Sequence, residues 1–267
     1  MERNNYKQIL TQRMMGKRGQ TTAFIIIALV IVVFGILIYF LYPQISTVFG
    51  FDTEPSSFMK SCIKPSLEDG VDLLSRQGGY AEPEGYMLYK GEMVKYLCYT
   101  AQYYTPCYVQ QPLLRAHFEK ELEAMIKEKA DECALELQEY YESRGYDVTR
   151  GSSTDVDVDI VMNSIDVDVH SPMTISKDDA QRFENFRFGM RSQMYSLIMT
   201  AMSVIDFEST YGDSETTMYM AYYPNLKIQK TKLGDGSTIY TLTYVNTEES
   251  FTFASRSVAW PAGYGLN

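Results

Sequence analysis

The sequence lacks the motifs that mark the common enzyme classes. It contains no P-loop, no GxGxxG fingerprint, no HExxH metal motif and no GxSxG nucleophile elbow. Only two histidines occur in 267 residues, which leaves little room for histidine-based acid–base chemistry. No CxxC pair is present, so neither a zinc ribbon nor a thioredoxin-like site is expected. The sequence names no reaction, and we expect a non-enzymatic protein.

A basic excess is also missing. The chain carries 24 Lys and Arg against 34 Asp and Glu, a formal net charge of −10. A nucleic-acid-binding protein needs a basic surface, so we expect no nucleic-acid partner. The absence of any Asn-x-Ser/Thr sequon predicts no N-glycosylation. The ordinary charged and hydrophobic fractions, 22% and 45%, indicate a folded chain.

Charge is distributed unevenly around one long apolar run. Residues 1–20 carry five Lys or Arg residues against the single acidic residue Glu2, and residues 23–42 contain no charged side chain. Twenty helical residues rise about 30 Å, the thickness of a bilayer's hydrocarbon core. The run is longer than the apolar region of a cleaved secretory signal, and no small-x-small cleavage site follows it. These observations predict a single transmembrane helix.

The flanking charge predicts the orientation. Basic residues stay in the cytoplasm, so the C-terminal part is expected outside a single-pass protein of the cytoplasmic membrane. The predicted segments are a cytoplasmic basic segment (1–20), a transmembrane helix (21–42), a linker (43–54) and an exterior domain (55–267).

A resemblance appears at the start of the apolar run. Lys17-Arg18-Gly19-Gln20-Thr21-Thr22-Ala23-Phe24 resembles the class III signal of archaeal type IV pilin-like proteins. The resemblance implies cleavage between Gly19 and Gln20. It also implies an apolar helix that packs against copies of itself in a filament or holds a monomer in the membrane. Phe24 departs from the Glu that many pilins carry there, and a plain uncleaved signal anchor is the alternative.

The remaining chain is similar, more loosely, to a group of membrane-anchored archaeal surface proteins with no assigned activity. The resemblance rests on a Cys soon after the anchor, the helix end at Gln77-Gly78-Gly79-Tyr80, a second helix with Cys133, and the segment from Val167 to Ser176. It implies an architecture and a location, and it implies no activity.

Helical and extended segments alternate in the exterior part. A helix is expected within Pro55–Arg76, interrupted or begun at Pro65, because Gly78-Gly79 suits its end. A second helix should run between Pro112 and Gly145, and a third from Ser176 to about Phe207. Strands should occupy 80–110, 155–170 and 216–258, with a hairpin turn at Gly234–Ser237. The predicted fold class is α+β: one transmembrane helix, then an exterior domain of about three helices and antiparallel strands.

Tyrosines gather in residues 80–110. Tyrosine favours strands because its ring packs on a pleated surface while its hydroxyl stays in water. Packing in a small sheet is therefore the simpler explanation. The functional alternative is an aromatic surface that binds a glycan or a protein. The tyrosines are Tyr80, Tyr86, Tyr89, Tyr96, Tyr99, Tyr103, Tyr104 and Tyr108.

The four cysteines follow the apolar run and are even in number, which suggests disulfides in an exported domain. Cys133 continues the apolar stripe of the second helix, and Cys62 lies on the first. We favour Cys62–Cys133, with Cys98–Cys107 closing the tyrosine-rich segment. Buried free thiols are the alternative.

An acidic alternating segment is the one candidate for site chemistry. In residues 155–170, a turn at Asn163-Ser164 would place Asp159 opposite Asp168 and Asp157 opposite His170. Facing carboxylates repel, and Ca²⁺ would relieve that repulsion through oxygen ligands. A solvated acidic face relieved by nearby Lys or Arg is the simpler alternative, because no EF-hand loop is present.

Together these features predict a membrane-anchored cell-surface protein that is not an enzyme. Its expected role is that of a pilin-like or surface-interaction subunit in adhesion or assembly. Its expected partners are the membrane, copies of itself through the apolar helix, and a surface protein or glycan. No cofactor is expected beyond the Ca²⁺ alternative. The alternative function is a membrane-tethered extracellular ligand-binding module or hydrolase.

Overall fold

The computed structural model describes Ile27 and residues 29–33, 54–177 and 179–259. It divides the chain into two units, residues 1–53 and 54–267, which are described separately. In the first unit, Ile27 and residues 29–33 are helical. The predicted basic segment, its cleavage residues Gly19 and Gln20, and the linker up to residue 53 lie outside the described residues.

The predicted transmembrane helix is the first correction. Within the ranges that the structure describes, no helix is both long enough and apolar enough to cross a bilayer. The membrane-spanning part of the predicted fold class and the predicted placement in the cytoplasmic membrane are therefore wrong.

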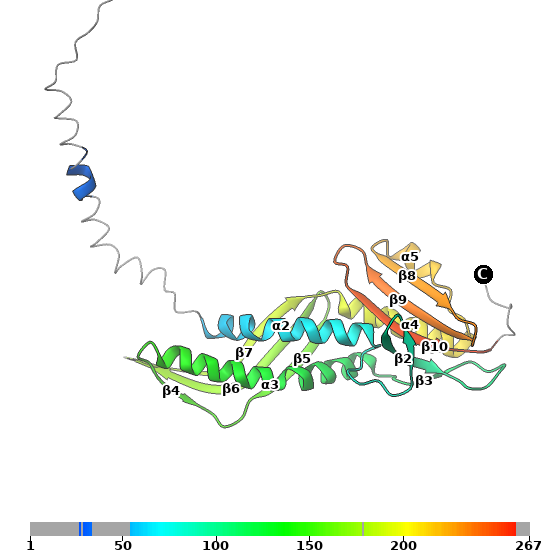
Figure 1. The fold of residues 1–267 in the computed structure, drawn as a ribbon, viewed down its shortest axis with the longest axis horizontal. Coiled ribbons are helices and arrows are strands. Elements are labelled where there is room, and N and C mark those ends of the chain that lie inside the picture. Colours follow the sequence, from blue (N-terminus) through cyan, green and yellow to red (C-terminus); the bar gives the residue numbers. More distant parts are fainter. Residues whose placement is uncertain (1–26, 28, 34–53, 178, 260–267) are drawn as a thin grey trace, which may run out of the picture. The chain divides into compact units, whose positions relative to one another are not determined.

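The second unit is α+β, as predicted, and alternates helices with strands (Figure 1). The predicted antiparallel pairing holds except between β2 and β10, which run parallel. Its helices are α2 (Pro55–Arg76), α3 (Leu114–Glu142), α4 (Met194–Tyr211) and α5 (Thr217–Tyr222). Its strands are β1 (Tyr86–Tyr89), β2 (Glu92–Tyr99), β3 (Tyr108–Val109), β4 (Asp147–Arg150), β5 (Asp155–Val161), β6 (Ser164–Ser176), β7 (Ala180–Arg191), β8 (Leu226–Lys232), β9 (Ser237–Tyr244) and β10 (Ser250–Arg256).

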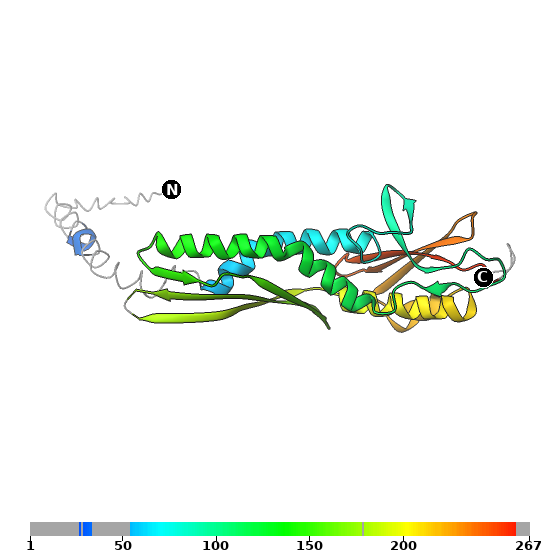
Figure 2. The same ribbon diagram turned by 90° about the horizontal axis from the view of Figure 1, so that it is seen from below.

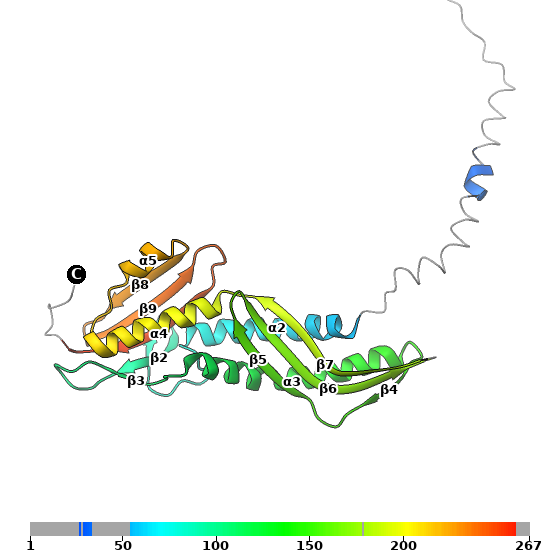
Figure 3. The ribbon, with the colours of Figure 1, turned by 180° about the vertical axis from the view of Figure 1, so that it is seen from behind.

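The strands form two sheets. One has six strands in the order β1-β2-β10-β9-β8, with β3 also paired to β2. The other has four strands, in which β4, β5 and β7 all pair with β6. The helices α2 and α3 run side by side against the four-stranded sheet (Figure 2). The helix α4 packs on the six-stranded sheet, which Figure 3 shows from behind. One continuous hydrophobic core extends from the four-stranded sheet to the six-stranded sheet.

Apolar stripes explain the packing of α2 against α3. Ile63 and Leu67 of α2 are fully buried, as are Leu122 and Ile126 of α3. Burying such a side chain stabilises the fold by about 1.5–3 kcal/mol. The bounds of α2 match the predicted span, and the helix continues through Pro65. The disulfide Cys62–Cys133 joins the two helices, with its Cα atoms 5.9 Å apart. This is the pairing that the sequence favoured.

The predicted third helix is wrong in its first half, which forms the strand β7. Phe183 and Phe186 are spaced three residues apart, which resembles a helical stripe. They instead share the inner face of β7, opposite Met173 and Val169 of β6. A register shift in β6 between His170 and Met173 adds one residue there and changes the alternation of β7. The helix begins only at Met194.

Candidate interaction surface

The predicted acidic hairpin exists with a different register. Val161 pairs with Ser164, so the turn is Met162-Asn163 rather than Asn163-Ser164. Asp157 therefore faces Asp168, and Asp155 faces His170. The predicted pairs Asp159–Asp168 and Asp157–His170 are wrong. Asn163 occupies the left-handed region, with φ of 64°, which Asn tolerates better than Ser. Because pairs shift by two residues, every aspartate keeps its solvent-facing side.

Cations of the protein itself relieve the repulsion in this hairpin. Arg187 Nε lies 2.6 Å from Asp168 Oδ2, and Lys127 Nζ lies 2.9 Å from Asp155 Oδ1. Arg115 Nη1 lies 3.8 Å from Asp159 Oδ1. In the part of the chain that the structure describes, no group of three or more His, Cys, Asp or Glu residues could hold a metal ion. This arrangement agrees with a solvated acidic face.

The two histidines lie in different surroundings. His170 is exposed, and its Nδ1 lies 2.7 Å from Asn185 Oδ1, while the neighbouring Ser171 is buried on the opposite face. No Ser–His pair can therefore form there. His117 stacks on Tyr80 at 4.0 Å between ring centroids. Burial lowers the pKa of His117, which favours its neutral form. His117 is a packing residue of α3.

The edge of the four-stranded sheet is closed by α3. Glu119 Oε1 accepts a hydrogen bond from the Ile160 backbone N–H at 2.8 Å, and Glu123 Oε1 accepts one from Val158 at 3.1 Å. These amides lie on the outer edge of β5, where a bare strand would invite pairing with another chain. Burial raises the pKa of Glu119, and the Ile160 hydrogen bond opposes that effect. The charge run on α3 is thus more than a solvated face.

The edge of the six-stranded sheet at β3 is very different. Residues 99–108, which we call the tyrosine loop, connect β2 to β3 and expose most of their aromatic rings. Tyr103, Tyr104 and Tyr108 are 70%, 72% and 64% exposed. The sequence contains no charged residue between Lys95 and Arg115, so the loop and its flanks are neutral. Exposed, uncharged and aromatic segments of this kind are typical of binding surfaces.

The tyrosine loop is held at both ends. The disulfide Cys98–Cys107 closes it, with its Cα atoms 5.3 Å apart, and this is again the pairing that the sequence favoured. The Tyr104 backbone N–H donates to Val258 O at 2.7 Å. The Arg256 guanidinium lies 6.0 Å from the ring centroids of both Tyr99 and Tyr103. These contacts tie the loop to β2 and to the segment that follows β10.

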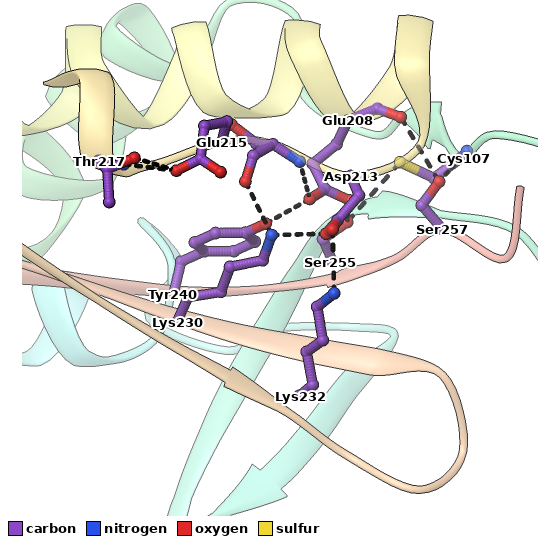
Figure 4. Close-up of polar contacts among 11 residues, drawn as sticks. Cys107, Glu208, Asp213, Glu215, Thr217, Lys230, Lys232, Tyr240, Ser255 and Ser257 are labelled. Carbon is purple, nitrogen blue, oxygen red and sulfur yellow. Dashed lines mark hydrogen bonds and ion pairs between the residues drawn. The ribbon is translucent and has the colours of Figure 1, made fainter. Parts of the chain in front are cut away.

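A buried polar network lies beneath the loop (Figure 4). Glu208 of α4 is only 2% exposed. Its carboxylate accepts hydrogen bonds from the Tyr240 hydroxyl, from the Ser214 N–H at 2.9 Å and from Ser255 Oγ at 3.1 Å. Burial raises the pKa of Glu208, and the hydrogen bonds from Tyr240 and Ser214 and the charge of Lys230 oppose that effect in part. The network joins α4 to β9 and β10.

The same network reaches the loop disulfide. Ser255 Oγ lies 3.7 Å from Cys107 Sγ, and the Cys107 backbone N–H donates to Ser257 Oγ at 3.2 Å. Beside it, Asp213 binds Lys230 at 2.5 Å and Lys232 at 2.9 Å. Glu208 itself is enclosed, and Ser255 connects it to Cys107 of the loop disulfide.

Tyr104 has a left-handed backbone conformation, which Lys90, Asn163 and Glu248 share among the described non-glycine residues. Its φ of 61° lies in the left-handed region, which costs an L-residue with a Cβ about 1–2 kcal/mol. Gly or Asn would adopt this conformation more easily. The ring, 72% exposed, recovers little of that cost through packing. The fold therefore gains little from a tyrosine at this position.

A groove of about 710 Å³ lies between the two sheets. Residues of α2, of the β7–α4 junction and of the β9–β10 turn line it. Three of its carboxylates have partners within the protein: Glu68 binds Lys64 at 2.9 Å, Asp72 binds Arg76 at 3.0 Å, and Glu249 accepts the Gln193 N–H at 2.8 Å. Glu248 and Arg191 also line the groove.

Comparisons with known proteins assign no family. No family model matches the chain, and no curated protein or solved structure matches it either. The functional argument therefore rests on the chain's own residues. Sequence reasoning found the tyrosines of the loop, but it missed the Glu208 network, because Glu208, Tyr240 and Ser255 are distant in the sequence and lack a motif.

Proposed function

We propose that residues 54–259 form a non-enzymatic interaction domain that works outside the cell or in another oxidising environment, and that the tyrosine loop binds a protein partner. Two disulfides support the oxidising environment, since such bonds persist mainly in exported proteins. The loop supplies the binding surface.

The observation that carries the proposal is Tyr104 itself. A bulky residue in the left-handed region, with an exposed ring, lowers the stability of the fold. Conformational strain of this kind is typical of functional positions. The presence of a tyrosine at this costly position is explained if the ring of Tyr104 contacts another molecule.

The composition of the loop favours a protein over a glycan as that molecule. Binding cores in protein interfaces are enriched in Tyr and Arg and depleted of Asp, Glu and Lys. Tyrosine gives a large contact area at a low cost in conformational entropy, and a preformed loop lowers that cost further. The tyrosine loop, with Arg256 beside it, meets this description.

The test measures binding of the labelled, purified chain to the outer surface of cells that produce it. The double variant Tyr103→Ser/Tyr104→Ser should bind at least about tenfold more weakly, as expected for the loss of binding hot spots. The matched control is Met162→Ser, which removes a side chain of equal exposure, 70%, from the β5–β6 turn.

Two outcomes would contradict the proposal. Equal binding of the loop variant and the control would remove the loop from the binding surface. Binding that survives protease treatment of the cells, and is lost after periodate oxidation of their glycans, would replace the protein partner with a glycan.

A further inference from the structure

A second uncharged aromatic surface lies at the opposite edge of the six-stranded sheet. We call it the α5 patch, and it consists of Met218, Tyr219, Tyr222 and Tyr223. These four side chains surround a hollow of about 390 Å³. Met218, Tyr222 and Tyr223 are 58%, 75% and 61% exposed. The helix α5 packs beside β8, whereas the tyrosine loop leads into β3 at the other edge.

The α5 patch shares the charge pattern of the tyrosine loop. No charged residue occurs between Glu215 and Lys227, just as none occurs between Lys95 and Arg115. The other long uncharged stretches after Glu54 and before residue 257 mostly form α4 and β9, which pack in the core. The segments of the tyrosine loop and of the α5 patch differ from these other uncharged stretches because they expose aromatic side chains.

We propose, building on the proposed function, that the partner of the tyrosine loop is the α5 patch of a second copy of this chain. The net charge of −10 makes copies repel each other, which normally keeps proteins monomeric. Uncharged surfaces are the places where two such copies meet with little local repulsion. The tyrosine loop protrudes, and the α5 patch offers a hollow lined by aromatic rings that an aromatic side chain would fill.

This contact differs from a symmetric dimer. The two surfaces are distinct and lie at opposite edges of one sheet, so each copy keeps one free loop and one free patch after pairing. A contact between two different surfaces is heterologous, and it continues into an open chain or a ring. The inferred product is therefore a head-to-tail assembly through the six-stranded sheet.

Photo-cross-linking of the full chain tests the contact directly. A benzoylphenylalanine replaces Tyr104, and the labelled chain is mixed with isotopically heavy wild-type chain. We expect cross-links from position 104 of one copy to residues 217–223 of another, identified by mass spectrometry. Intermolecular cross-links that map elsewhere, or their absence at concentrations where the chain associates, would overturn the inference.

A mixing experiment tests the polarity. The variants Tyr103→Ser/Tyr104→Ser and Tyr222→Ser/Tyr223→Ser should each associate at least about tenfold more weakly than wild type, because each removes exposed aromatic anchors. A mixture of the two should form dimers, because one variant keeps the loop and the other keeps the patch. A mixture that stays monomeric, or variants that each associate like wild type, would contradict a head-to-tail contact. Leu88→Ser, which removes an exposed apolar side chain elsewhere, is the control.

Salt gives an independent signature. Screening weakens the repulsion between like-charged copies, so association through neutral surfaces should strengthen as salt rises. Weakening with salt would indicate ion pairs instead. If the loop variant loses cell binding while no loop-to-patch cross-link forms, the proposed function stands and the second copy is excluded as the partner. If cell binding is unchanged, the proposed function itself fails.

Discussion

The outer edge of the four-stranded sheet and the β3 edge of the six-stranded sheet differ in how their exposed groups are paired. On β5, the backbone N–H groups of Val158 and Ile160 donate to carboxylates of α3. On the outer face, Asp155 lies beside Lys127 and Asp168 beside Arg187. At the other edge, the tyrosine loop exposes neutral aromatic rings. The first edge is satisfied within the molecule, while the second gains most from contact with another molecule.

The two disulfides follow the same division. Cys62–Cys133 joins α2 to α3 across 71 residues and serves the fold. Cys98–Cys107 closes only nine residues and serves the conformation of the tyrosine loop. The stability of the fold and the conformation of the tyrosine loop should therefore depend on different disulfides. Substitutions in one disulfide should affect one property more than the other.

The largest expected effect is the loss of the long disulfide. Cys62→Ala/Cys133→Ala should lower the free energy of unfolding by about 4 kcal/mol, because loop-closure entropy grows with the closed length. Cys98→Ala/Cys107→Ala should cost about 2.5 kcal/mol by the same relation. Urea denaturation measures both. Only the second pair should abolish binding to cells under conditions where the protein stays folded, and an equal effect of both pairs on binding would remove the distinction.

The second largest expected loss of stability follows from removing a carboxylate that accepts hydrogen bonds along the edge of β5. Glu119→Ala leaves the buried N–H of Ile160 without its acceptor and should cost about 1–3 kcal/mol of stability. Glu128→Ala, an exposed position on the same helix, is the control and should change stability by less than about 0.5 kcal/mol. Chemical denaturation decides the point. We also expect the Glu119 variant to aggregate more readily, and an equal stability of the two variants would show that the edge is not protected this way.

The buried carboxyl of Glu208 predicts a pH dependence. Its pKa is raised in the folded protein, so the folded state holds the proton more tightly than the unfolded state does. The stabilisation by this carboxyl is complete below its usual value of 4.5 and is lost as pH rises through the raised pKa.

The variant Glu208→Gln keeps the shape and cannot ionise. Its stability relative to wild type should therefore increase as pH rises, by less than the loss of the short disulfide costs. Denaturation midpoints between about pH 4 and pH 9 measure this difference. Glu248→Gln, at an exposed turn, removes the same charge and serves as the control. A difference between wild type and Glu208→Gln that does not vary with pH would contradict the account of this network.

The smallest effect on stability concerns the loop. Tyr104→Asn should raise the free energy of unfolding by up to about 1 kcal/mol, since Asn adopts the left-handed region more easily. The same change should weaken binding to cells. Thermal denaturation and cell binding are measured on one preparation. A variant that is destabilised and binds normally would show that the ring serves the fold.

The sequence predicted those elements whose signals are local. The Pro55 start and the Gly78-Gly79 end bounded the span of α2, and the stripe through Cys133 favoured the disulfide to Cys62 that the structure contains. The turn residues at Gly234–Ser237 located the β8–β9 hairpin. In each case, neighbouring residues determine the local backbone and so leave a readable pattern.

The failures depend on contacts between distant residues. The spacing of Phe183 and Phe186 suggested a helix because the register shift that explains it lies on another strand, β6. The exposure of Tyr103 and Tyr104 could not be distinguished from strand packing, because tyrosine suits both. The support of the loop by Glu208 requires three segments of the chain to meet.

The most direct test of the central claim is a footprint of the individual tyrosines by chemical nitration, read by mass spectrometry. The protein is nitrated free and when bound to cells. We predict that Tyr103, Tyr104 and Tyr108 react readily in the free protein and lose most of that reactivity on binding, while the exposed Tyr86 on β1 stays reactive. Loop tyrosines that react equally in the bound and free protein would show that the tyrosine loop is not the binding surface.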